Sequence, residues 1–131
     1  MIFFQMTAIA DIVDYFGWKE VIAIYTDDDF GRNGISALED KSSENQCTIS
    51  YKAPMNPNPS KDDIKKVLFQ VTLQESRILV LHTTSDHGPR IMNVARSLRM
   101  LDSGFVWIAT DWLTNILDAD LLLLWINFHL A

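Results

Sequence analysis

Four short strand-like segments recur at nearly regular intervals along this chain, each separated from the next by a stretch long enough for one helix. They cover residues 21–25, 47–51, 77–82 and 105–109. Apolar runs of this kind are typical of strands that are buried on both faces of a parallel sheet. Because parallel strands need a long crossover between them, the pattern predicts successive right-handed βαβ units. We therefore expect an α/β fold with a doubly wound parallel sheet of about four strands, flanked by helices.

The stretches before and between these segments carry apolar residues at three- and four-residue steps, which indicates helices with one buried face. One such helix precedes the first strand and stops at Gly17, and another is expected over residues 33–44. Ser60 is placed to cap the third helix, with Asp62 and Asp63 favouring its positive end. The expected inward-facing residues are Met6, Ile9, Ala10, Val13 and Phe16, then Ile35 and Leu38, then Ile64, Val67, Leu68 and Val71, and finally Ile91, Val94, Ala95 and Leu98.

Size and composition limit the classes of protein that fit. A chain of 131 residues with 48% hydrophobic residues is the size of one globular domain. Its net charge of -6 disfavours a nucleic-acid partner, which needs a basic face. The single cysteine, Cys47, is expected as a buried thiol. The start shows no signal-peptide pattern, and the apolar tail at 121–131 is too short to span a bilayer.

In open parallel sheets, ligands bind beyond the carboxyl ends of the strands, where helix N-termini present unpaired N–H groups. The first of these ends carries a cluster of acidic residues. Asp27, Asp28 and Asp29 could coordinate a hard cation or accept hydrogen bonds from an amine, or they could be a solvated turn that caps a helix. Phe30 follows them, and its ring could cover a ligand's ammonium or methylene group or fold back onto the core.

Asp111 follows the last predicted strand directly and is flanked by Thr110 and Trp112. Its carboxylate could pair with a ligand ammonium, or it could cap the next helix. His82 and His87 share one loop, but a metal site would need further ligands that the spacing does not supply. No nucleophile elbow, phosphate loop or dinucleotide fingerprint follows any strand, so we expect neither catalysis nor a cofactor.

Several segments resemble plant glutamate receptor-like channels in their extracellular amino-terminal region. The resemblance covers residues 4–120 in order, leaving 121–131 as a divergent apolar tail. It is most specific in YTDDDFGRNG and VWIATDWL, at 25–34 and 106–113. The other matching segments are residues 5–13, 16–19 and 75–77.

The resemblance implies part of a bilobed domain of the periplasmic amino-acid-binding type, which closes around its ligand. It also implies that an aromatic residue and an acid hold the ligand's α-amino group, and these positions match Phe30 and Asp111. Phe30 stands where a tyrosine is more usual. Met1 and Ile2 stand where such relatives have an Asp and a neighbouring Ser, so one amine-binding acid is missing, and the chain is expected to be a fragment.

The leading hypothesis is a ligand-sensing lobe of a glutamate receptor-like protein, with Phe30, Asp111, Asp29 and Thr110 as ligand-binding residues. The resemblance further implies an amino-acid ligand, a ligand-gated cation channel with sister subunits, a likely tetramer by family, and an extracellular position at the plasma membrane. The alternative hypothesis is a magnesium-dependent phospho-receiver-like domain or another α/β enzyme, since clustered aspartates after a strand can hold Mg²⁺ for phosphoryl transfer.

Overall fold

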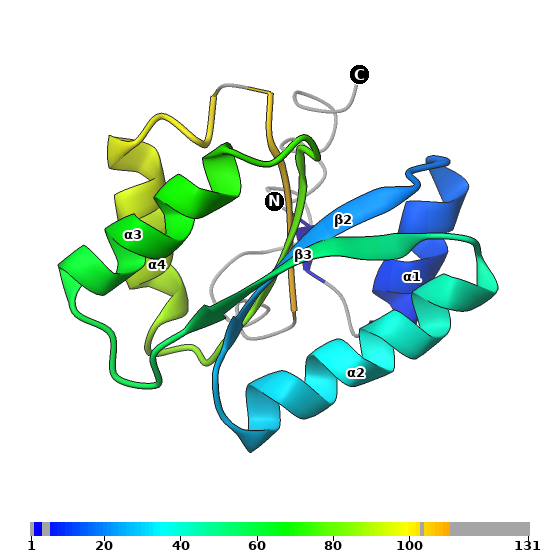
Figure 1. Cartoon of the computed structure of the whole chain (residues 1–131), viewed down its shortest axis with the longest axis horizontal. Helices are drawn as coiled ribbons and strands as arrows, with labels where there is room; N and C mark the ends of the chain where they lie inside the picture. Colours follow the sequence, from blue (N-terminus) through cyan, green and yellow to red (C-terminus); the bar gives the residue numbers. More distant parts are fainter. Residues whose placement is uncertain (1, 4–5, 103, 111–131) are drawn as a thin grey trace.

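The chain forms an α/β sandwich of a parallel sheet between two pairs of helices (Figure 1). The computed structural model describes residues 2–3, 6–102 and 104–110. Asp111, the segment 113–117 and the tail 121–131 therefore lie outside the described residues, and the division at residue 120 stays a prediction. The elements are β1 (Ile2–Phe3), α1 (Met6–Tyr15), β2 (Glu20–Thr26), α2 (Asp29–Glu44), β3 (Thr48–Met55), α3 (Lys61–Thr72), β4 (Ile78–His82), α4 (Gly88–Ser97) and β5 (Val106–Ala109).

All strand pairs are parallel, and the strands lie in the order β1-β5-β4-β2-β3. This confirms the doubly wound α/β fold that the sequence predicts. The sheet has one strand more than the four predicted, because β1 pairs with β5 through Ile2 opposite Ile108. Two residues are too few to show a periodic pattern, which is why the sequence does not predict β1.

β2 is an interior strand of the described sheet, next to the edge strand β3. Residues 21–24 have no exposed surface, and the strand pairs with β3 on one side and β4 on the other. β3 pairs only with β2 among the described strands, and its residues alternate between exposed and buried positions in part of its length. Its edge position tolerates Pro54, which has no N–H to donate. β3 therefore continues to Met55, four residues beyond the predicted end at residue 51.

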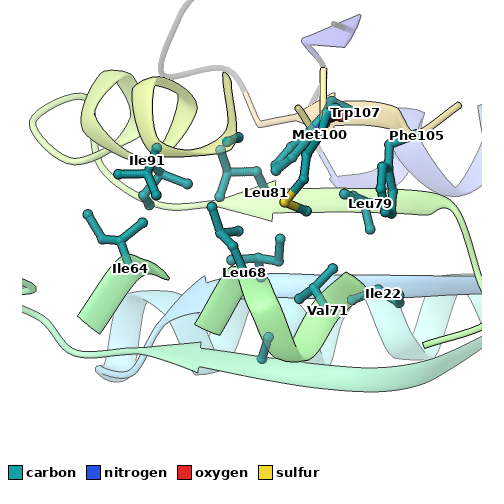
Figure 2. Close-up of a cluster of buried hydrophobic side chains, with 14 of the residues drawn as sticks. Ile22, Ile64, Leu68, Val71, Leu79, Leu81, Ile91, Met100, Phe105 and Trp107 are labelled. Atoms are coloured by element: carbon teal, nitrogen blue, oxygen red, sulfur yellow. Dashed lines mark hydrogen bonds between the residues drawn. The ribbon is translucent and has the colours of Figure 1, made fainter. Parts of the chain in front are cut away.

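Alternate residues of the strands point to opposite faces and build two apolar cores. α3 and α4 cover one face, with Ile22, Leu79 and Trp107 beneath them (Figure 2). α1 and α2 cover the other face, where Val21 and Val80 lie with Cys47. The Cys47 thiol is buried as predicted, and this burial raises its pKa.

Side-chain caps begin two of the helices. Ser60 Oγ accepts a hydrogen bond from the Asp63 N–H at 3.1 Å, and the Asp63 carboxylate accepts one from the Ser60 N–H at 2.9 Å. This capping box confirms the predicted role of Ser60 and holds the pKa of Asp63 below its ordinary value. α2 begins at Asp29, so the predicted start at Asn33 is four residues late. No helix in the described ranges is both long and apolar enough to cross a membrane.

We expect Ser60→Ala to lower the free energy of unfolding by about 1 kcal/mol, because it removes the acceptor for the Asp63 N–H. Urea denaturation measures the change. Ser36→Ala is the matched control, since Ser36 is an exposed position inside α2 where alanine favours the helix. Equal effects of the two substitutions would contradict the assignment of the cap.

Candidate binding site at the strand switch point

The chain reverses its direction of travel across the sheet at β2. From β2 it crosses to β3 on one side, and from β3 it passes back to β4 on the other. Such a switch point opens a crevice between the carboxyl ends of the two neighbouring strands, which is where ligands bind in this class of fold. In this chain the rule places that crevice between the loops that follow β2 and β4. The hydroxyls of Thr26 and Thr83 are 2.8 Å apart at its base, and both residues are buried.

The three aspartates after β2 are engaged with the chain itself. Asp28 caps α2 by accepting a hydrogen bond from the Gly31 N–H at 2.8 Å. Arg32 donates to Asp27 at 2.8 Å and to Asp29 at 3.1 Å, and these bonds raise the pKa of the Arg32 guanidinium. The side chain of Asp29 is 96% exposed. These contacts match the capping interpretation for Asp28 and partly neutralise the other two carboxylates.

The Phe30 ring packs against the ring of His82, the last residue of β4. The two rings are stacked, with centroids 4.4 Å apart and an angle of 27° between the planes. His82 is 7% exposed, whereas Phe30 is 51% exposed. Phe30 therefore combines the two arrangements that the sequence leaves open: one ring face rests on the protein, and about half of the side chain faces solvent.

His82 also links the loops on either side of it. Its Nε2 lies 3.3 Å from the Phe30 carbonyl oxygen, which can only accept, so Nε2 carries the hydrogen. In the neutral ring Nδ1 then accepts from the Thr110 hydroxyl, 3.2 Å away. The imidazole thus fixes the start of α2 and the end of β5 to the same point.

Two glycines let α2 approach the strand ends this closely. A Cβ on Gly31 would overlap the carbonyl oxygen of Thr26, and a Cβ on Gly34 would overlap the His82 ring. Both glycines belong to the segment that carries the family resemblance. Glycine is needed at both positions because there is no space for a side chain, and not because the backbone has a positive φ angle.

Of the residues predicted to bind ligand, Phe30, Asp29 and Thr110 lie near the carboxyl ends of β2 and β5, and His82 contacts both Phe30 and Thr110. Thr110 is 4% exposed and its N–H donates to the Leu81 carbonyl at 3.1 Å. Asp111 follows it but lies outside the described residues. In the part of the chain that is described, no three side chains of His, Cys, Asp or Glu gather in a way that could hold a metal ion.

The sequence interpretation missed His82 as a structural part of this site, since it considered the residue only as a metal ligand. One feature of the sequence could have indicated this role of His82. A polar ring at the end of a run of buried apolar residues, on the edge where ligand loops converge, needs hydrogen-bond partners from neighbouring loops.

The fold and crevice define a class of protein: a parallel α/β lobe with a ligand site at its switch point. The family model described as "Receptor family ligand binding region" matches residues 3–127. The chain belongs to this family, which is defined by binding a ligand rather than by catalysis.

The chain is also similar to plant glutamate receptors. It is 49% identical over 115 residues to Glutamate receptor 3.1 of Oryza sativa subsp. japonica, covering 88% of this chain and 12% of that protein. It is 49% identical over 117 residues to Glutamate receptor 3.4 of Arabidopsis thaliana, covering 89% and 12%. Glutamate receptor 3.2 of the same plant is 44% identical over 119 residues, covering 88% and 13%. The chain thus spans about an eighth of the length of these relatives.

We expect Gly34→Ala to destabilise the protein by about 1–3 kcal/mol, because its methyl group would enter the space of the His82 ring. In a His82→Ala background the ring is gone. The same substitution then only replaces a helix glycine and should stabilise by about 0.5–1 kcal/mol. Urea denaturation of the four proteins gives both values. A destabilisation of equal size in both backgrounds would show that the ring does not set the requirement for glycine.

Proposed function

We propose that this chain forms one lobe of an amino-acid-sensing region, and that the crevice between β2 and β4 contributes half of the ligand site. The observation that carries the proposal is Phe30, whose ring is braced by buried His82 and half exposed at the switch point. An aromatic face held in this way can cover a ligand ammonium without losing much side-chain entropy on binding. The family and the names of the relatives support the same assignment.

Two residues are proposed to contact the ligand's ammonium group. Phe30 covers the ammonium and Asp111 pairs with it. Thr110 gives its hydroxyl hydrogen to His82, which leaves oxygen lone pairs to line the site. Asp29 lies at the outer edge, where Arg32 competes with a ligand ammonium for its carboxylate. The ligand's carboxylate then belongs to an opposing lobe.

In a longer receptor, closure of two such lobes around an amino acid would bias the opening of a cation channel. We propose that sister subunits assemble around that channel, in a tetramer, with this lobe on the extracellular side of the plasma membrane. The names of the relatives support a receptor role. Nothing in the arrangement of the three aspartates favours the magnesium-dependent alternative, because Arg32 and the Gly31 N–H already occupy them.

We expect Phe30→Ala to weaken amino-acid binding by about 0.5–2 kcal/mol, roughly two- to thirtyfold in Kd, through loss of the ring face. Phe30→Tyr should retain binding, since it keeps the ring. Calorimetry with a panel of L-amino acids, each paired with its N-acetyl counterpart, measures the effect. The N-acetyl compounds lack the ammonium and should bind more weakly.

Phe69→Ala is the matched control, because Phe69 is 57% exposed on α3. If Phe69→Ala and Phe30→Ala have equal effects, or if the N-acetyl compounds bind as tightly as the amino acids, the proposed amine site is wrong. Asp111→Asn tests the carboxylate in the same assay and should weaken binding of the amino acids only.

A further inference from the structure

A second concave site lies on the opposite face of the sheet, in the groove between α3 and α4. Its volume is about 240 Å³. Ile64 and Val94 form its floor and are 1% and 5% exposed. Figure 2 shows Ile64 pointing from α3 toward Ile91 of α4, so the floor is continuous with the apolar core. The polar residues that line the groove are Lys61, Arg90, Asn93 and Ser97.

The charges in this groove have one sign. Lys61 and Arg90 face it from two different helices, and no carboxylate lines it. Within the described residues, neither cation has an ion-pair partner within 4.0 Å. The carboxylate of Asp63 is near in sequence, but it accepts the Ser60 N–H in the capping box. Among the described residues, the lining of the groove therefore carries only positive charge, in a chain of net charge -6.

One of the two cations is held in place. Arg90 Nη2 donates to the Pro59 carbonyl oxygen at 2.7 Å, which ties the guanidinium to the loop before α3. A guanidinium has five N–H donors, so the others remain for a ligand. Ser97 donates to the Val94 carbonyl at 2.7 Å, and its oxygen can still accept.

We propose that the groove between α3 and α4 binds a small carboxylate with an apolar body. The guanidinium of Arg90 suits a carboxylate, which it can bind through two parallel hydrogen bonds, and Lys61 adds a second positive charge. Ile64 and Val94 then take the apolar body. The volume is below the roughly 300 Å³ at which drug-sized pockets begin, so the ligand is small.

The groove shares no residue with the crevice at Phe30 and His82. It lies on the α3 and α4 face, whereas those residues lie at the α2 face. The carboxylate site therefore does not rest on the proposed amine site, and either can fail without the other.

The test is a titration of the 131-residue chain with 3-phenylpropionate, followed by ¹⁵N–¹H NMR up to about 10 mM. The neutral isostere 3-phenylpropanamide and inorganic sulfate are titrated in parallel. We expect the carboxylate to shift amides of α3 and α4 and to bind at least about tenfold more tightly than the amide, because only the carboxylate makes charge-assisted bonds. Sulfate should bind more weakly, since it cannot use the apolar floor.

Lys61→Gln and Arg90→Gln should each weaken binding about tenfold. Lys65→Gln and Arg96→Gln remove a charge from the same two helices outside the groove and should change Kd less than twofold. Among the described residues the Lys61 side chain has no hydrogen bond or ion pair, so its variant tests the site even if Arg90→Gln disturbs the loop at Pro59. Absence of shifts on α3 and α4, equal binding of the amide or sulfate, or equal effects of the groove and control substitutions would each overturn the proposal.

Discussion

The burial of β2 on both faces and along both edges is the constraint from which the rest of the fold follows. Val21, Ile22 and Ile24 have no exposed surface, and burying each such side chain contributes about 1.5–3 kcal/mol. Parallel neighbours can be joined only by long crossover connections, which here carry helices. The chain leaves β2 toward β3 and returns past it to β4, and the switch point at the end of β2 is a geometric result of that path.

Polar contacts join the strand ends that surround the switch point. His82 stacks on Phe30, contacts the Phe30 carbonyl and bonds to Thr110, while Thr26 and Thr83 meet beneath. Buried polar groups that are fully partnered favour one arrangement, since any other leaves a donor or acceptor unsatisfied. A lobe that closes on an amino acid benefits from this, because the ring that is proposed to meet the ammonium is already in position before binding.

Much of this arrangement could be predicted from the sequence. The predictions succeeded for features that a local sequence pattern determines. The apolar runs gave the main strands, Ser60 was correctly expected as a cap, and Cys47 is buried as expected. The prediction failed where tertiary contacts override local preference. The sequence predicts the second helix from Asn33, yet α2 begins at Asp29. Gly31 and Gly34 disfavour a helix by propensity, but here they allow the helix to approach the strand ends.

The candidate site, too, could be predicted only where the local sequence determines the position of a residue. Phe30 and Thr110 follow strands whose ends must lie on one edge of a parallel sheet, so their proximity to the crevice could be expected. The role of His82 could not, because its partners Phe30 and Thr110 come from loops 52 and 28 residues away. Which loops meet at an imidazole depends on strand order, and periodicity alone does not specify that order.

The most direct test of the amine site is to map where an amino acid binds on this chain. A titration with L-glutamate, followed by ¹⁵N–¹H NMR, detects weak binding and locates it residue by residue. If the amine site is as proposed, the shifts will centre on residues 26–32, on His82 and Thr83, and on Thr110. Shifts confined to other parts of the chain, or none with any amino acid at millimolar concentration, would contradict it.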